Sequence, residues 1–179
     1  MKSAEHQARR LARYAALVRE FAPRLDLVSP GDLEIFESRH VADSTRLGPL
    51  IATAPEGPAA DVGSGSGVPG IPLAILDPQR HWTLIEPRAR RAGFLEEAIR
   101  RLELPNCSVF VGTAAQAAEG GLGGSFSVVV ARALAAPPRA AEICRPLVAP
   151  EGWLLLMVGR GTTVPNAEEV LPGVLRIMS

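Results

Sequence analysis

The first third of the chain has the hydrophobic pattern of helices. Between residues 4 and 22, apolar side chains recur every three or four positions, which predicts an amphipathic helix that Pro23 ends. Ser29-Pro30-Gly31-Asp32 then predicts a second helix start, with serine as the N-cap and proline in the first turn. The expected buried positions are Ala8, Leu11, Ala12, Ala15, Val18 and Ala22 in the first helix, and Leu33, Ile35, Phe36 and Val41 in the second.

From residue 59 onward, short apolar runs alternate with helical stretches. The pattern predicts strands at 59–63, 82–86, 107–111, 126–132 and 153–158, with helices at about 69–76 and 88–102. Strands that are apolar throughout are typical of a parallel sheet buried on both faces. We therefore expect an α/β fold in one structural unit: a doubly wound, mostly parallel sheet over residues 59–179, behind an N-terminal helical extension over residues 1–58. The tail, residues 165–179, is expected to be short and to hold one strand.

Composition narrows the class of protein. With 47% hydrophobic and 21% charged residues, the chain is not disordered as a whole, and its 19 basic residues cancel its 19 acidic ones. No apolar run approaches the ~18 residues of a membrane span, and the polar N-terminus does not resemble a secretory signal. The two cysteines have no metal-ligand or disulfide spacing, so a reduced, cytoplasmic protein without a membrane partner is expected.

The most informative segment is a glycine-rich turn between a strand and a helix. Gly63, Gly65 and Gly67 allow positive φ and close approach of a ligand to the backbone. A dinucleotide site is the obvious competing interpretation, because Gly65, Gly67 and Gly70 also form a G-x-G-x-x-G. Asp61, two residues before the first glycine, favours an amino-bearing ligand over a pyrophosphate, and prolines crowd the following helix. Glu86 ends the next strand, where a carboxylate can accept hydrogen bonds from ribose hydroxyls.

Four motifs together resemble a known family. RHVADS (39–44), DVGSGSGVPGIPLAI (61–75), TLIEPRARRAGFLEE (83–97) and VVARALA (129–135) are similar in order and spacing to the bacterial 16S ribosomal RNA guanine-N7 methyltransferases, the glucose-inhibited division protein B family. The resemblance implies a class I, Rossmann-like methyltransferase that uses S-adenosyl-L-methionine, acts on 16S ribosomal RNA or the small ribosomal subunit, and works as a monomer. It also implies that residues 59–179 form the cofactor-binding domain.

The resemblance also implies residue roles. Gly63 and Val68 would line the methionine end of the cofactor, Glu86 would bind the ribose, and Arg132 would close the pocket. The cofactor-binding set implied is Gly63, Ser64, Gly65, Val68, Glu86, Ala114, Ala115 and Arg132. The RNA-facing set is His40, Arg88, Arg90, Arg91 and Arg160. No catalytic residue is implied, because guanine N7 carries an in-plane lone pair and needs alignment rather than a base.

Several departures from the family keep other functions open. Asp26-Leu27-Val28, Thr113-Ala114-Ala115 and Val158 replace the residues usual at those places, which leaves a small-molecule methyltransferase or a non-catalytic cofactor-binding module as alternatives. Single residues also have structural alternatives. His40 would cap Asp43 or Ser44, Arg132 would pair with an acid, and Cys144 would pack in the core. Arg88, Arg90 and Arg91 begin a helix, where the helix dipole disfavours cations, so they either bind phosphate or lie on a solvated face.

Overall fold

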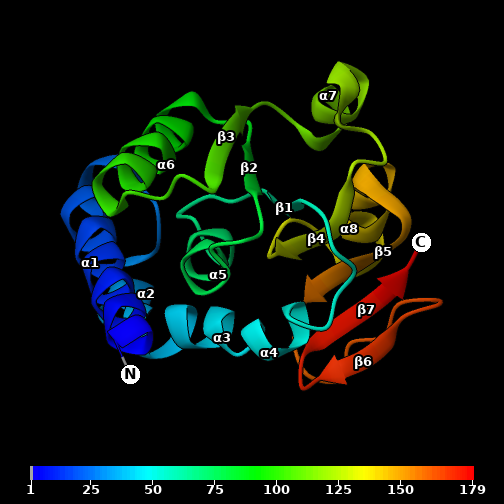
Figure 1. Cartoon of the computed structure of the whole chain (residues 1–179), viewed down its shortest axis with the longest axis horizontal. Helices are drawn as coiled ribbons and strands as arrows, with labels where there is room; N and C mark the ends of the chain where they lie inside the picture. Colours follow the sequence, from blue (N-terminus) through cyan, green and yellow to red (C-terminus); the bar gives the residue numbers. More distant parts are fainter. Residues whose placement is uncertain (1) are drawn as a thin grey trace.

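One mixed seven-stranded sheet forms the centre of the molecule (Figure 1). The computed structural model describes residues 2–179 and gives the strand order β3-β2-β1-β4-β5-β7-β6. Strands β1 to β5 are mutually parallel, and β7 runs antiparallel to β5 and β6. The predicted doubly wound α/β fold is confirmed. The strands are β1 (Ala59–Val62), β2 (Trp82–Glu86), β3 (Cys107–Val111), β4 (Phe126–Arg132), β5 (Val148–Met157), β6 (Glu168–Leu171) and β7 (Val174–Met178).

The strand register brings three predicted site residues to one edge of the sheet. Val62, the last residue of β1, pairs with Ile85 of β2 and with Ala131 of β4. The next residues along, Gly63, Glu86 and Arg132, therefore follow at the same carboxyl edge. The winding direction of the sheet reverses between β1 and β4, which is where open α/β sheets bind ligands.

Helices cover both faces of the sheet (Figure 1). Alternate residues of β4 face opposite sides: Val128 and Val130 pack in one hydrophobic cluster, and Val129 and Ala131 pack in the other. The first cluster includes residues of α1 (Lys2–Leu25), α5 (Gly70–Leu76) and α6 (Ala89–Leu102); the second includes α7 (Ala114–Ala117) and α8 (Pro137–Cys144). Short helical turns, η2 (Ala118–Leu122) and η3 (Arg145–Leu147), complete the second face. Among the described helices, none has the length and apolar character of a membrane span.

The first helix differs from the prediction in its end and its buried face. Helix α1 continues past Pro23 to Leu25, because a proline in the last turn removes only one backbone donor of a helix that is already ending. Ala8 and Ala12 are exposed, whereas Tyr14 and Leu17 are buried. The apolar stripe is therefore rotated toward the larger side chains, because these bury more apolar area than alanines.

The predicted second helix is divided into several short pieces. Ser29 is the N-cap of α2 (Pro30–Glu34), as predicted, and its Oγ accepts from Asp32 N at 3.1 Å. The helix then breaks at Ile35, whose backbone is non-helical and whose side chain is 38% exposed rather than buried. A π-helical segment, η1 (Phe36–Val41), follows, with α3 (Ala42–Thr45) and α4 (Gly48–Ile51) after it.

The tail forms a hairpin, so the prediction of one strand is wrong. Strands β6 and β7 are joined by Pro172 and Gly173, and Gly173 adopts a positive φ of 72° that suits glycine. Strand β5 also begins at Val148, five residues earlier than predicted, with an irregular register to β4.

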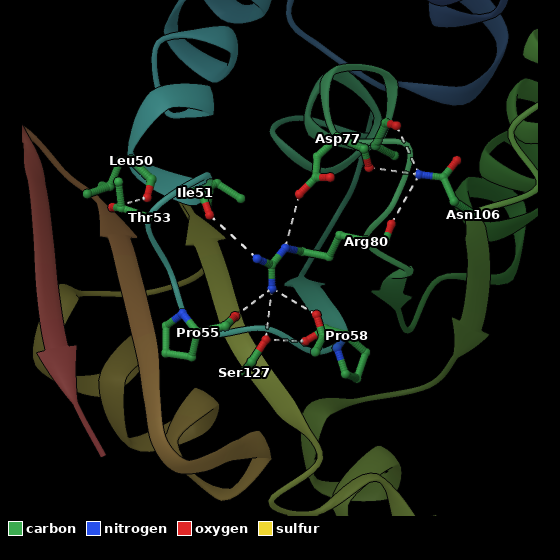
Figure 2. Close-up of polar contacts among 11 residues, drawn as sticks. Leu50, Ile51, Thr53, Pro55, Pro58, Asp77, Arg80, Asn106 and Ser127 are labelled. Atoms are coloured by element: carbon green, nitrogen blue, oxygen red, sulfur yellow. Dashed lines mark hydrogen bonds and ion pairs between the residues drawn. The ribbon is translucent and has the colours of Figure 1, made fainter.

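At the opposite, amino edge of the sheet, Arg80 forms hydrogen bonds both to the segment that follows α4 and to β4 (Figure 2). Its Nη1 donates to Pro55 O at 2.9 Å, to Gly57 O at 2.8 Å and to Ser127 Oγ at 2.9 Å, while its Nε pairs with Asp77 at 3.2 Å. The side chain is 9% exposed. An amino-edge cavity of about 660 Å³ lies beside it, between α1, α4 and α5.

Candidate functional site

The glycine turn after β1 is shaped by close backbone contacts. Gly63, Gly65 and Gly67 have φ values of 74°, 55° and 97°, all in the region that favours glycine. A Cβ on Gly63 would lie 2.7 Å from Leu134 Cδ1, whereas one on Gly65 would meet nothing closer than 3.8 Å. A side chain at Gly63 would therefore clash with Leu134, whereas one at Gly65 would make only ordinary van der Waals contacts.

Glu86 holds this turn in place. Its carboxylate accepts from Gly65 N through Oε2 and from Arg88 N through Oε1, both at 2.9 Å, and the residue is 3% exposed. A solvated strand-end acid is thereby ruled out. Each carboxylate oxygen has a second lone pair, so Glu86 can accept further hydrogen bonds while keeping both backbone contacts.

Asp61 has a structural place rather than a ligand-facing one. Its side chain is 1% exposed and accepts from Gly70 N at 3.0 Å, at the start of α5. Burial raises the pKa of Asp61 to about 7. The interpretation of this acid as the group that selects an amino-bearing ligand is not supported, because the carboxylate is enclosed by the turn itself.

Helix α1 also supports the turn, through a residue that the sequence analysis missed. Tyr14 Oη donates to Ser66 O at 2.7 Å, and Tyr14 is 0% exposed. Burial raises the pKa of Tyr14 well above its usual value, so the hydroxyl remains a donor. Tyr14 is the one tyrosine in the sequence and lies between the apolar positions of the predicted helix, which is the signal that could have found it.

The segment after β3 reaches the same edge. Gly112 N donates to Glu86 O at 3.1 Å, and Thr113 caps α7 by accepting from Gln116 N at 3.2 Å. Ala114, the first residue of α7, is buried, and Ala115 is exposed. The altered Thr113-Ala114-Ala115 segment is therefore a capped helix start beside Glu86.

At the end of β4, Arg132 is the first member of a polar chain. Its Nη2 donates to His40 Nδ1, and His40 Nε2 donates to Asp32 Oδ1 at 3.0 Å. Because a guanidinium only donates, this arrangement requires neutral His40 with its proton on Nε2. Burial, and then the charge of Arg132, lower the pKa of His40 and favour that form.

These hydrogen bonds differ from what the sequence predicted for His40 and Arg132. His40 is 7% exposed with both ring nitrogens occupied, so the expectation that its ring faces RNA is not supported. Its ring caps neither Asp43 nor Ser44; instead, Ser44 Oγ donates to the His40 carbonyl at 2.7 Å. Arg132 contacts a histidine rather than the acid of the alternative interpretation.

The arginines at the start of α6 bind the end of α1. Arg90 Nη2 donates to Arg24 O at 2.9 Å, and Arg91 Nη2 donates to Asp26 O at 2.6 Å. The last carbonyls of a helix lack intrahelical partners, so these contacts are favourable. Arg90 and Arg91 thus have a structural contact that the sequence did not predict; Arg90, like Arg88 and Arg160, is also exposed, and Arg91 is half-buried.

Sequence comparison identifies the family. The model of the rRNA small subunit methyltransferase G family matches residues 7–168. The chain belongs to this family. Relatives named ribosomal RNA small subunit methyltransferase G include that of Acidiphilium cryptum, 43% identical over 84% of this chain and 68% of its own, and that of Paracoccus denitrificans, 35% identical over 88% and 79%. For the relative from Mycolicibacterium gilvum, the chain spans 63% of its length.

Solved structures confirm the Rossmann-like class I methyltransferase fold. A SAM dependent methyltransferase from Aquifex aeolicus superposes with a TM-score of 0.60 at 16% identity, over 86% of this chain and 95% of its own. A protein from Corynebacterium glutamicum gives a TM-score of 0.62 at 16% identity, over 93% and 89%.

Proposed function

We propose that this protein transfers a methyl group from S-adenosyl-L-methionine to N7 of a guanine in small-subunit ribosomal RNA, in the cytoplasm and as a monomer. Membership of the rRNA small subunit methyltransferase G family carries the proposal. The cofactor supplies a methyl group on a positively charged sulfur. The convergence of the glycine turn, Glu86 and Arg132 at one sheet edge supports binding of that cofactor there.

The described residues fit S-adenosyl-L-methionine. Glu86 is held by two backbone N–H groups with lone pairs left for the ribose hydroxyls. Gly63, Ser64 and Gly65 present backbone in the turn, and no neighbouring atom lies closer than 3.8 Å to the position of a Cβ on Gly65. We assign Val68 to the methionine end of the cofactor, Ala114 and Ala115 to the adenine, and Arg132 to the rim of the pocket.

The chemistry asks this chain for alignment rather than for a nucleophile or base. Guanine N7 attacks through its own lone pair, so holding it in line with the methyl group and excluding water are the main contributions. The cysteines do not offer a covalent route: both are buried, and burial raises the pKa values of Cys107 and Cys144 to about 12. Arg88 and Arg160, which are exposed, remain the proposed RNA contacts from the sequence.

The test is methyl transfer to small ribosomal subunits from cells that lack the gene. We expect the purified protein to introduce 7-methylguanosine, detected by mass spectrometry of the digested RNA. Binding of S-adenosyl-L-methionine with no transfer to RNA would instead favour a small-molecule enzyme or a non-catalytic module.

Glu86→Gln is the matched variant for the cofactor site. It removes the charge that strengthens the ribose contacts and replaces one of the two oxygens that accept from backbone N–H groups by an NH2 donor. Cofactor affinity should therefore fall roughly tenfold to a hundredfold by calorimetry, about 1.5–3 kcal/mol. Glu86→Asp, which keeps the charge but shortens its reach, separates the two requirements. An unchanged dissociation constant in both variants would remove Glu86 from the cofactor site.

A further inference from the structure

A separate cavity lies where the N-terminal helices, the ends of β4 and β5, and the C-terminal hairpin meet. Its volume is about 400 Å³. Its lining includes Arg39, Asp43, Arg46, Arg132, Val158 and Gly173, and we refer to it as the arginine cavity. A cavity of this size is within the range of small-ligand sites.

Two buried donors in this lining have no hydrogen-bond partner. Among the described residues, the buried side-chain donors left unpaired are Arg46 Nε, Arg132 Nη1 and Trp82 Nε1, and the first two belong to the arginine cavity. Arg46 Nε forms an ion pair with Asp43 Oδ1 at 3.6 Å, which is longer than a hydrogen bond. Buried polar groups are nearly always paired, so two unpaired guanidinium donors beside one cavity indicate an acceptor that binds there.

The guanidinium groups are held in place by their other contacts. Arg46 Nη1 donates to Pro172 O at 2.8 Å, in the turn between β6 and β7. Arg132 Nη2 donates to His40. Both side chains are therefore positioned before any ligand arrives, which reduces the entropy lost on binding.

The charge of the lining favours an anion. The lining holds three arginines, Arg39, Arg46 and Arg132, and one acid, Asp43. The cavity also lies near the glycine turn, because two of its lining residues, Ala133 and Ala135, flank Leu134, whose Cδ1 lies 2.7 Å from the position of a Cβ on Gly63. An anion bound here would lie beside the proposed cofactor site.

We propose that the arginine cavity binds a phosphate group of the nucleotide whose guanine is methylated. The inference rests on the proposed function and adds a site to it. Guanidinium groups bind phosphate oxygens through charge-assisted hydrogen bonds. The phosphate fits the reaction better than the base as the partner of these donors, because an arginine that donated to guanine N7 would occupy the lone pair that accepts the methyl group. Arg39, the first residue of the RHVADS motif, and Arg46 are thus substrate-binding residues, although neither belongs to the RNA-facing set that the resemblance implied.

The first experiment compares 5′-GMP with guanosine as probes, on protein saturated with S-adenosylhomocysteine. We expect 5′-GMP to bind at least tenfold more tightly than guanosine by calorimetry or NMR titration. Arg39→Gln and Arg46→Gln should each weaken 5′-GMP roughly tenfold to a hundredfold and leave guanosine unchanged. Arg13→Gln, an exposed arginine of α1 outside the lining, is the charge-matched control and should have no effect.

Two further measurements keep the proposal open to refutation. Arg39 is exposed, so Arg39→Gln should retain the fold, and Arg46→Lys retains a donor for Pro172 O if Arg46→Gln loosens the hairpin. In binding to small ribosomal subunits, each lost phosphate contact should lower the slope of log affinity against log salt by about one unit.

The outcomes distinguish this inference from the proposed function. If S-adenosylhomocysteine does not bind and RNA is not methylated, the proposed function fails. If both occur but 5′-GMP binds no better than guanosine, or Arg39→Gln and Arg46→Gln leave its affinity unchanged, the phosphate site is wrong. If the variants weaken 5′-GMP but change neither subunit binding nor methyl transfer, the cavity binds a free nucleotide and its assignment to RNA is wrong.

Discussion

Arg80 and Arg132 are both largely buried arginines, at opposite edges of the same sheet, and their surroundings differ. At the amino edge, Arg80 donates to backbone carbonyls and a hydroxyl and pairs with Asp77 (Figure 2). At the carboxyl edge, Arg132 has one protein acceptor, His40, and its Nη1 is buried without a partner. The fold therefore pairs the donors of Arg80 described here, whereas Arg132 keeps one buried donor without an acceptor.

The cavities beside the two arginines differ in volume and in lining, and the larger cavity is not the one with unpaired donors. The amino-edge cavity is the larger, at about 660 Å³ against about 400 Å³ for the arginine cavity. None of its lining residues contributes to the unpaired buried donors of the described chain. The third such donor, Trp82 Nε1, lies at the amino end of β2 and lines neither cavity. The contrast is therefore between the two cavities: the arginine cavity has unpaired donors in its lining, which are costly to the fold unless a ligand pairs them, and the larger cavity has none.

The largest expected effect is on stability, from Arg80→Ala. The substitution leaves Pro55 O and Gly57 O without their donor and removes the link to Ser127, so we expect a loss of about 3–5 kcal/mol in the free energy of unfolding. Urea denaturation measures this. Arg139→Ala is the control, because Arg139 is 68% exposed and its pairing with Glu142 should contribute less than about 1 kcal/mol. A similar small loss in both variants would mean that the Arg80 contacts do not support the fold.

The next effect is on function, from Arg132→Gln. Losing the guanidinium should lower kcat/KM for methyl transfer to small subunits roughly tenfold to a hundredfold, about 1.5–3 kcal/mol. Stability should change by less than about 1 kcal/mol, because the variant also removes a buried unpaired donor. If Arg132→Gln instead lowered the free energy of unfolding by about 3–5 kcal/mol, as expected for Arg80→Ala, the contrast between the two edges would be wrong.

The sequence predicted the edge of the sheet at which the candidate site lies, but only some of the contacts that hold its residues. The apolar strands, the glycine turn and Glu86 have local signals, and sheet register then brings them together without further information. The hydrogen bonds that link Asp32, His40 and Arg132 have no such signal. His40 and Arg132 are 92 positions apart, and their contact depends on how the N-terminal helices pack. The same holds for Tyr14 and Ser66, 52 positions apart.

Local reasoning also failed where a side chain serves a neighbouring element. The dipole of α6 disfavours Arg90 and Arg91 at its start, but their donors reach carbonyls at and just after the end of α1. Pro23 predicts the end of the first helix, which continues for two more residues. In each case, the missing information was the position of the next element in space.

A smaller effect concerns the residue that positions Arg132. Protonation of His40 removes the lone pair at Nδ1, so we expect kcat/KM to fall at acid pH. Burial, and secondly Arg132, lower the pKa of His40 from 6.5, so its contribution is complete above about 6.5 and is lost as pH falls through the lowered value. His40→Ala should reduce kcat/KM about tenfold at pH 8.

His40→Asn is the matched variant, because its amide oxygen can accept from Arg132 near the place of Nδ1. It should restore much of the activity and lack the acid limb that His40 causes. If His40→Asn and the parent protein lost activity over the same pH range, His40 would not be the group that titrates.

The smallest effect tests whether Arg90 and Arg91 stabilise the fold, as Arg80 does, or contribute to binding, as proposed for Arg132. Replacing both by alanine leaves Arg24 O and Asp26 O to water, so the free energy of unfolding should fall by about 1 kcal/mol. Arg9→Ala with Arg13→Ala, two exposed arginines of α1, is the matched control and should change stability by less than about 0.5 kcal/mol. If the pair serves the fold, the salt dependence of binding to small subunits should stay the same.

A slope of log affinity against log salt reduced by one to two units, with stability unchanged, would show that both arginines bind RNA, since each lost phosphate contact releases about one counterion fewer. Because Arg91 Nη1 lies 3.9 Å from the position of a Cβ on Gly65, cofactor affinity measured alongside would show whether loosening the end of α1 also disturbs the glycine turn.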